Sequence, residues 1–535
     1  MPCIFMKKLF ILFMFFNSFA HAQQEDAWVY FTDKPDTDYY MANPLEMLSQ
    51  KALDRRANQG IVLDSKDVPI HSAYVTGIDA ATGITVMAKS KWLNAVHVRG
   101  TQAQINALEN LTFVNSIDFA NHSLNNGRFM QPTQTGATQT TLENFNYGTS
   151  GEQVQMLNGH LLHQQGYTGD GVTIAIMDAG FPGVNTTQPF AQLINNNLIL
   201  GGHNFVANST NFYTGGNHGT RVLSTIAGYT PGQLVGSAPD AFYYLFITED
   251  YLSENPVEES YWVEAAERAD SLGVDIISTS LGYFDYDNPA YNYTYNDLDG
   301  ETAFITRGAN IAFTRGMFLV TSAGNEGATA QLYIGVPADA INTLTVGAVD
   351  ATEQYAYFSS VGPSADGRIK PDVMAKGLAA VIADIDGTIT TGNGTSFSAP
   401  ILAGVVACLW QAAPNKTNAE LLQIVRESAD RYNNPNAQYG YGIPDFSTAL
   451  QAALGLQDAD PDKFIVYPNP TTGATYILNA GNSGTVTFYN SLGQQVYKHE
   501  LGKGNTLNLH NLPAGFYSFV ILSGNKTQSG KLIKQ

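Results

Sequence analysis

Apolar strand-like segments alternate with helical segments over residues 151–455, and this alternation constrains the fold more than any other feature of the 535-residue chain. The strand-like segments are apolar on both faces and read VTIAIMD, AFYYLFI, VDIISTSL, MFLVTSAGN and TLTVGAVD. Strands of this kind that are joined through helices form a mainly parallel sheet buried between helical layers. The sequence therefore predicts an α/β domain with helices on both faces, whose chemistry lies at the carboxyl ends of the strands.

The regions on either side of this domain have different patterns. Residues 23–119 suggest strand, helix, two strands, helix and strand, which predicts a ferredoxin-like α+β unit. Within it, we expect a helix in NPLEMLSQKALDRRANQG and extended segments around HSAYV and WLNAVHV. Residues 120–150 are rich in Asn, Gln, Thr and Gly and predict a linker that is open to proteolysis. Residues 456–535 contain short segments between Gly and Asn turns and predict a small β-sandwich.

Residues 1–22 have the pattern of a secretory signal peptide. Lys7 and Lys8 precede an apolar run, and Ala20-His21-Ala22 provides the cleavage site. A membrane anchor is the alternative, but the apolar run is too short to span a bilayer. The net charge of −20 argues against a nucleic-acid partner. Of the two cysteines, Cys3 lies in the signal, so we expect an exported protein without an intrachain disulfide.

Three polar residues fall where strands end or helices begin. Asp178 ends VTIAIMD, His218 opens a helical segment in GGNHGTRV, and Ser396 opens another in GTSFSAP. Each alone has a simple explanation, as a turn residue, an exposed histidine or a helix cap. Together they form a nucleophilic set, because an imidazole oriented by a carboxylate can take the proton of a serine hydroxyl.

The segments IAIMDAGF, NHGTRVLSTIAG and GTSFSAPILAGVVA resemble the Asp, His and Ser motifs of the subtilisin-like serine peptidases, the subtilases. The resemblance covers about residues 151–455. It implies a serine endopeptidase in which Asp178, His218 and Ser396 are the catalytic residues. Ala179 is a departure, because the family often has a hydroxyl residue there. A catalytically silent surface or adhesion protein that keeps the same fold is the alternative.

The resemblance also implies the remaining parts of the site. Asn325, in TSAGNEG, is expected to bind the oxyanion. Two uncharged walls are expected to bind substrate and to favour an apolar or mixed residue before the cut; they consist of Ser278, Thr279, Ser280, Leu281, Gly282, Ser322, Ala323 and Gly324. The Tyr-rich segment 282–297 is either a substrate-facing loop or part of the outer surface.

The flanking regions resemble known modules as well. The resemblance implies that the N-terminal unit is an inhibitory propeptide, although a permanent accessory domain is an alternative. YPNP, LPAGFY and KLIK resemble the C-terminal sorting domain of type IX secretion in Bacteroidota, with a carbohydrate-binding sandwich as the alternative. The implied partners are polypeptide substrates, the chain's own propeptide and the type IX machinery. The implied location, reached through the periplasm, is the extracellular medium or the outer-membrane surface.

The chemistry of a serine peptidase requires no cofactor. Carboxylates in NDLDGE and DADPDK could hold a structural calcium ion, but neither segment has the full spacing of a calcium loop. The sequence therefore leaves metal binding and its ligands open.

Overall fold

The computed structural model describes residues 23–124, 145–455, 464–467, 469, 471–478, 484–502, 506–524 and 526–535. The chain divides into two compact units, Met1–Ala453 and Leu454–Gln535. Each unit is described by itself. The expected signal peptide, and most of the expected linker, lie outside the described residues.

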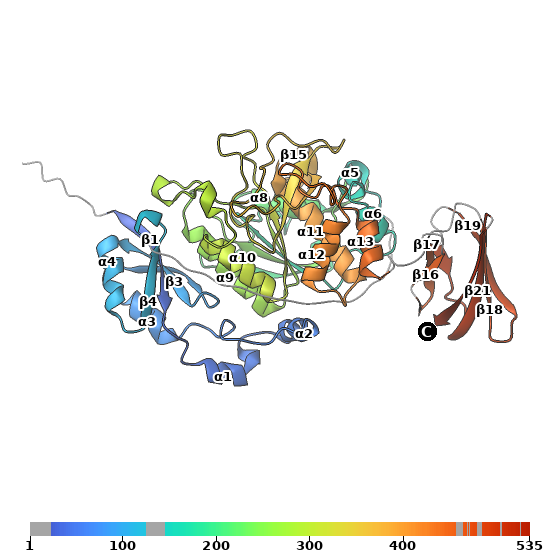
Figure 1. Cartoon of the computed structure of the whole chain (residues 1–535), viewed down its shortest axis with the longest axis horizontal. Helices are drawn as coiled ribbons and strands as arrows, with labels where there is room; N and C mark the ends of the chain where they lie inside the picture. The colour runs from blue at the N-terminus through green and yellow to red at the C-terminus, as the bar shows by residue number, and fades with distance from the viewer. Residues whose placement is uncertain are drawn as a thin grey trace, which may run out of the picture. The chain divides into compact units, whose positions relative to one another are not determined.

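A seven-stranded sheet forms the centre of the first unit (Figure 1). Its order is β13-β12-β11-β10-β5-β9-β6, and every neighbouring pair is parallel. The strands are β5 (Thr173–Asp178), β6 (Ile199–Asn204), β9 (Phe242–Ile247), β10 (Ile276–Thr279), β11 (Phe318–Ser322), β12 (Leu344–Val349) and β13 (Val373–Lys376). The central strands β5, β10, β11 and β12 are buried along their whole length, as their two-sided apolar pattern predicts.

Helices cover both faces of this sheet, which confirms the predicted α/β architecture. Helices α8 (His218–Ala227) and α11 (Thr395–Ala412) pack together on one face, and α9 (Val257–Leu272) and α10 (Phe304–Thr314) pack together on the other. Helix α11 is long and apolar enough to cross a membrane, but all of its residues are buried, as in the core helix of a globular domain. The domain is completed by α5 (Gly151–Gln155), α6 (Gly159–His163), α7 (Ala191–Asn195), α12 (Asn418–Glu427), α13 (Phe446–Ala453), β7 (Tyr229–Thr230), β8 (Leu234–Val235), β14 (Ala380–Ala383) and β15 (Ile389–Gly392).

The N-terminal part of the first unit is a four-stranded antiparallel sheet in the order β2-β3-β1-β4. Its strands are β1 (Gln24–Phe31), β2 (Thr85–Ser90), β3 (Ala95–Thr101) and β4 (Val114–Phe119). Helices α3 (Ser72–Asp79) and α4 (Gln102–Ala107) connect them in the order strand, helix, two strands, helix and strand. This order and sheet topology confirm the ferredoxin-like α+β prediction.

Two local predictions in this region were wrong. HSAYV was expected to be extended but begins α3, because Tyr74, Val75 and Ile78 together cover the core of the sheet from one side of a helix. The helix expected over residues 43–60 is divided into a short turn, Pro44–Glu46, and α2 (Gln50–Asn58), because Ser49 caps α2 by accepting a hydrogen bond from the Ala52 amide. Helix α2 also lies outside the ferredoxin-like unit. It belongs to residues 32–71 between β1 and α3, which also contain α1 (Thr37–Ala42) and which we call the insert.

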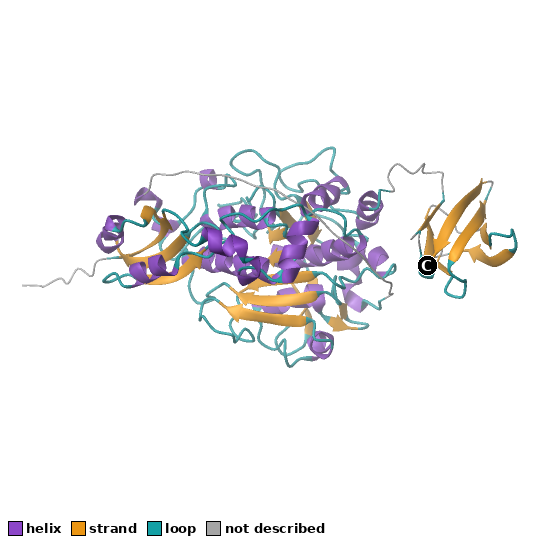
Figure 2. Cartoon of the chain, turned by 90° about the horizontal axis from the view of Figure 1, so that it is seen from below, coloured by secondary structure: helices purple, strands orange, loops and turns teal. Residues whose placement is uncertain are grey.

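The second unit consists of strands and loops, as Figure 2 shows. One antiparallel sheet contains β16 (Ile465–Tyr467), β17 (Ala474–Leu478) and β20 (Thr506–Asn508). The other contains β18 (Gly484–Tyr489), β19 (Gln495–Leu501), β21 (Gly515–Ser523) and β22 (Lys526–Lys534). Side chains of both sheets, such as Ile477 and Phe488, share one apolar core. The predicted small β-sandwich is therefore confirmed.

Candidate active site

The end of strand β5 and the first residues of helices α8 and α11 meet at the carboxyl edge of the parallel sheet. Asp178 is the last residue of β5, His218 the first of α8 and Ser396 the second of α11. The fold thus brings together three residues that are 40 and 178 positions apart in the chain. Such an edge is where α/β sheets generally bind ligands.

The Asp178 carboxylate is fully buried and orients His218. Its Oδ1 atom lies 2.7 Å from Nδ1 of His218 and accepts a hydrogen bond of 2.7 Å from the Ala179 amide. The other oxygen, Oδ2, is also buried, and no group among the described residues forms a hydrogen bond with it. Ala179, the next residue in the chain, has no side-chain hydroxyl to offer this oxygen.

The environment of His218 favours its protonated form. Burial disfavours the imidazolium, but the attraction of the Asp178 carboxylate and the hydrogen bond to it outweigh burial and raise the pKa of His218 above its ordinary value. A hydrogen bond from Nδ1 to Asp178 leaves Nε2 as the ring nitrogen that can take up a proton.

Ser396 is held at the beginning of α11 by two hydrogen bonds with Ser280. Its hydroxyl donates to the Ser280 carbonyl at 3.2 Å, and the Ser280 hydroxyl donates to the Ser396 carbonyl at 2.9 Å. The Ser396 carbonyl is free for this contact because its helical partner would be the amide of Pro400, which has no N–H. The neighbouring Ser398 is different, since its buried hydroxyl donates to the Thr395 carbonyl within the helix.

The side-chain amide of Asn325 has a defined orientation beside Ser396. Its Oδ1 atom accepts hydrogen bonds from the backbone amide of Thr395 (2.9 Å) and from the Thr395 hydroxyl (3.0 Å). Because the oxygen must face these donors, the Nδ2 amino group is left to face the pocket that Asn325 lines. An amide donor is therefore available in the pocket that Ser396 also lines.

A pocket of about 490 Å³ connects these groups. Both His218 and Ser396 line it, and so does Asn325. Of the expected substrate-binding residues, the structure brings Ser280, Leu281, Gly282, Ser322, Ala323 and Gly324 to this pocket. Ser278 and Thr279 do not line it, because both lie in the buried strand β10, where Thr279 accepts a hydrogen bond from the Trp262 indole.

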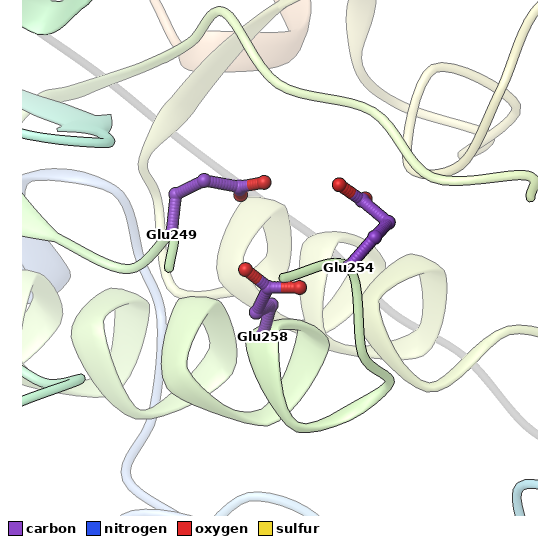
Figure 3. Close-up of side chains that lie close together, drawn as sticks. All are labelled: Glu249, Glu254 and Glu258. Atoms are coloured by element: carbon purple, nitrogen blue, oxygen red, sulfur yellow. The ribbon is translucent and has the colours of Figure 1, made fainter. Parts of the chain in front are cut away.

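Three glutamates that the sequence analysis did not single out lie close together, and two of them line this pocket. Glu249, Glu254 and Glu258 place carboxylate oxygens within 4.8 Å of one another, and Figure 3 shows the three side chains converging. Glu249 and Glu254 line the pocket, whereas Glu258 is buried in the first turn of α9 and accepts hydrogen bonds from two backbone amides. Glu249 lies two residues after the end of β9, so its position close to a strand end was the signal that could have identified it.

The pKa values of all three glutamates are raised. Burial is the main cause, and repulsion between neighbouring carboxylates adds to it. The pKa of Glu254 rises to about 7 and that of Glu258 to about 8. The negative charge of this glutamate cluster therefore increases as the pH rises through neutrality.

The Tyr-rich segment is mostly anchored inward. Tyr286 and Tyr293 each donate a hydrogen bond of 2.7 Å to the buried carboxylate of Glu259. At the beginning of the segment, Tyr283, Phe284 and Asp285 line the pocket. The start of the segment thus forms part of the pocket wall, and Tyr286 and Tyr293 anchor the remainder, of which Asp287, Pro289 and Ala290 are exposed.

The carboxylates considered for calcium have local roles. Asp297 accepts hydrogen bonds from the amide and hydroxyl of Thr294, and Asp299 accepts three from Glu301 and Thr302. The second segment, DADPDK, lies outside the described residues. Calcium binding stays a prediction.

Comparison with known proteins identifies three regions of the chain. Residues 26–139 match the peptidase S8 propeptide domain of Bacteroidota, residues 169–442 match the Subtilase family, and residues 465–535 match the secretion system C-terminal sorting domain. The sorting domain indicates that the protein is secreted or carried to the outer surface. Together with the propeptide domain, it implies interaction with a propeptide and with the secretion machinery.

Individual relatives agree with these matches. The chain is 32% identical to Subtilisin NAT of Bacillus subtilis subsp. natto over 301 residues, which is 56% of this chain and 70% of the relative. It is 32% identical to Subtilisin of Bacillus pumilus over 301 residues, 56% of this chain and 98% of the relative. It is 29% identical to M-protease of Shouchella clausii over 290 residues, 54% of this chain and 67% of the relative. The family match over residues 169–442, together with these relatives, shows that the chain belongs to the subtilases, the subtilisin family of serine peptidases, which need no cofactor.

Proposed function

We propose that this subtilase is a secreted endopeptidase in which Ser396 is the nucleophile, His218 the general base and Asp178 the residue that orients His218. The observation that carries the proposal is that His218, paired with the buried Asp178 carboxylate, and Ser396, at a helix N-terminus, line one pocket. Asn325 would bind the oxyanion, because its Thr395 contacts leave the amino group facing that pocket.

In the proposed reaction, the Ser396 hydroxyl turns from the Ser280 carbonyl toward Nε2 of His218, which takes its proton. Oγ of Ser396 then bonds to the substrate carbonyl carbon, and the carbonyl oxygen becomes an oxyanion that the amide of Asn325 stabilises. When the C–N bond breaks, His218 gives the proton to the leaving amine. Water attacks the acyl-enzyme in the same way and regenerates the Ser396 hydroxyl.

An extended polypeptide is the substrate class that suits the pocket walls. Residues 280–282 directly follow β10, and Ser322 to Gly324 lie at the end of β11, the neighbouring strand. Main-chain groups at the end of a sheet can pair with an extended peptide of any sequence, while pocket side chains select among sequences. We therefore propose cleavage within unfolded or extended protein segments.

The domain division completes the proposal. Residues 1–22 act as the signal peptide, 23–119 as the inhibitory propeptide unit, 120–150 as the linker that is cut during activation, 151–455 as the peptidase domain and 456–535 as the sorting domain. Its support is the order of the three family matches along the chain.

The test is hydrolysis of casein by the purified mature protein and by two matched variants. Ser396→Ala should abolish hydrolysis, and phenylmethylsulfonyl fluoride should do the same to the parent protein. Ser398→Ala is the control, because it removes a hydroxyl from the same turn of α11 and should retain activity. Activity that persists in Ser396→Ala would overturn the assignment. A parent protein that cleaves neither casein nor other unfolded proteins would favour the catalytically silent alternative.

A further inference from the structure

The insert forms a small structure of its own between β1 and α3. Met47, Leu48, Ala52 and Val68 form its apolar cluster, with Leu53 packed against them. A ferredoxin-like unit needs only one helix between its first two strands, and α3 already fills that position. The insert is therefore additional to the ferredoxin-like unit and is not required to complete its sheet.

Helix α2 of the insert is docked on the end of α9 in the peptidase domain. Arg55 forms a buried ion pair with Asp270, and its guanidinium also donates to the Val274 carbonyl. Arg56 lies 2.6 Å from the second oxygen of Asp270 and 2.8 Å from Asp67 of the insert. The Asp270 side chain is fully buried, and no more than 4% of either arginine side chain is exposed. Within this contact the two arginines share one carboxylate of the peptidase domain.

The backbone contacts show how closely the two parts approach. The Ser49 amide donates to the Ser271 carbonyl at 2.8 Å, and a side chain at Gly273 would meet Lys51 and Ala52 within 2.9 Å. Gly273 also has a φ of 81°, which L-residues with side chains rarely adopt. Glycine at the end of α9 thus both ends the helix and leaves room for α2.

The insert also reaches the amino ends of the parallel strands. Lys51 pairs with Asp275 (2.8 Å), which directly precedes β10. Gln59 donates to the carbonyl of Gly316 (2.9 Å), two residues before β11. The candidate active site lies at the carboxyl ends of the same strands. In a parallel sheet these ends form opposite edges, so the insert docks on the edge away from the pocket.

Each side of this interface contributes arginine side chains that pair with an aspartate of the other side. The insert contributes Arg55 and Arg56 opposite Asp270, and the peptidase domain in turn contributes Arg315 opposite Asp64 (3.0 Å). Truncating one member of a buried pair leaves the other charge buried and unpaired, which is strongly unfavourable. Arg55 and Asp270 are therefore the residues whose substitution tests the contact most directly.

We propose that the insert is a second anchor that holds the propeptide on the peptidase domain independently of the substrate pocket. The insert adds to the contact that the ferredoxin-like sheet itself makes with α9, as between Trp28 and Ser260 (2.8 Å). Release of the propeptide after linker cleavage then requires that the contact of Arg55 and Arg56 with Asp270 is broken as well. The partner is the peptidase domain of the same chain, and the surface it offers is the end of α9 with the amino ends of β10 and β11. This inference rests on the proposed activation by propeptide removal.

The experiment measures binding in a chain that has no nucleophile. The full chain carries Ser396→Ala and a recognition sequence for a site-specific protease inserted in residues 125–144. After the added protease cuts there, size-exclusion chromatography follows how long the propeptide fragment co-elutes with the remainder. We expect the parent to keep its propeptide, and Arg55→Ala to lose it at least tenfold faster. Lys66→Ala is the charge-matched control, because 41% of its side chain is exposed, and it should match the parent.

A thermal unfolding transition recorded before the cut checks that each variant is folded. If Arg55→Ala does not fold, Asp270→Asn decides, since it keeps the side-chain volume and changes only the peptidase side of the contact. Release from both variants at the parental rate would overturn the proposal, as would immediate release from the parent. Because the chain contains no Ser396 hydroxyl, this outcome does not depend on the casein result, and each proposal can fail without the other.

Discussion

Ser280 and Ser396 exchange two hydrogen bonds, each hydroxyl donating to the other residue's carbonyl, at 2.9 and 3.2 Å. The first of these bonds is available because Pro400 leaves the Ser396 carbonyl without a helical N–H partner. The pair connects the end of strand β10, where substrate is proposed to bind, with the first turn of α11. Ser280 is thus a positioning residue for Ser396 as well as part of the pocket wall.

Removing the Ser280 hydroxyl should therefore affect the chemical step more than substrate binding. We expect Ser280→Ala to lower kcat about tenfold, with little change in KM, because the start of α11 loses one hydrogen bond that holds it. Ser280→Thr restores a hydroxyl and should recover most of the loss. Steady-state kinetics on a peptide substrate measure both constants. An unchanged kcat in Ser280→Ala would show that the packing of α11 alone fixes Ser396.

One oxygen of the buried Asp178 carboxylate has no hydrogen-bond partner among the described residues, and Ala179 is the next residue in the chain. We expect Ala179→Ser to supply a hydroxyl donor beside Oδ2 and to stabilise the folded protein by about 1 kcal/mol. A higher thermal midpoint of the Ser396→Ala chain, which cannot digest itself, would be the readout. Ala179→Val, which adds volume without a donor, is the control. Equal midpoints for the serine variant and the unsubstituted chain would show that the hydroxyl does not reach Oδ2.

The Asn325 amide should stabilise the transition state of peptide hydrolysis and contribute little to substrate binding. The developing oxyanion is the group that its amide is proposed to meet, so Asn325→Ala should reduce kcat by a factor of about 10² to 10³, the loss known for the corresponding donor of subtilisin. KM should change by less than threefold. Because Oδ1 of Asn325 also accepts the Thr395 contacts, the unfolding transition of the variant needs to be recorded beside the kinetics. A loss that appears mainly in KM would contradict the oxyanion role.

The raised pKa of His218 predicts the pH profile. A general base must be neutral, so kcat/KM should fall as the pH drops through the pKa of His218, with a midpoint above the ordinary histidine value of about 6.5. Asp178→Asn removes the attraction and should move this midpoint to lower pH while reducing kcat by about 10⁴. Rates of peptide hydrolysis between pH 5 and 9 test both statements. A midpoint that stays in place in Asp178→Asn would show that another group titrates.

Glu254 should influence which substrates are preferred. It lines the pocket, and its pKa of about 7 means that it becomes negatively charged as the pH rises through neutrality. Peptides with Arg near the scissile bond should therefore be favoured over neutral analogues at pH 9 more than at pH 6, by about fivefold. Glu254→Gln should flatten this pH dependence, and the ratio of kcat/KM values for the two peptides measures it. A ratio that is independent of pH in the parent would contradict the prediction.

Much of the architecture could be predicted from the sequence because it depends on local patterns. Two-sided apolar runs predict buried parallel strands, and polar residues at a strand end and at two helix starts pointed to Asp178, His218 and Ser396 as a set. HSAYV was misjudged because five residues are too few to distinguish a strand from the start of a helix. Only the contact of Tyr74 and Ile78 with the sheet selects the helix.

The sequence by itself determined the class of each domain, the strand and helix ends that carry the chemistry, and the segments that carry the motifs. The tertiary structure decided which groups lie together. It places the Ser280 carbonyl beside the Ser396 hydroxyl, Glu249 and Glu254 in the pocket lining, and Asp270 beside Arg55. Arg55 and Asp270 are 215 residues apart. Apolar periodicity reports only whether a side chain faces inward, because it arises from neighbours a few positions away. A hydrogen bond or ion pair also depends on the direction from which a distant segment arrives, and only the packed fold fixes that direction.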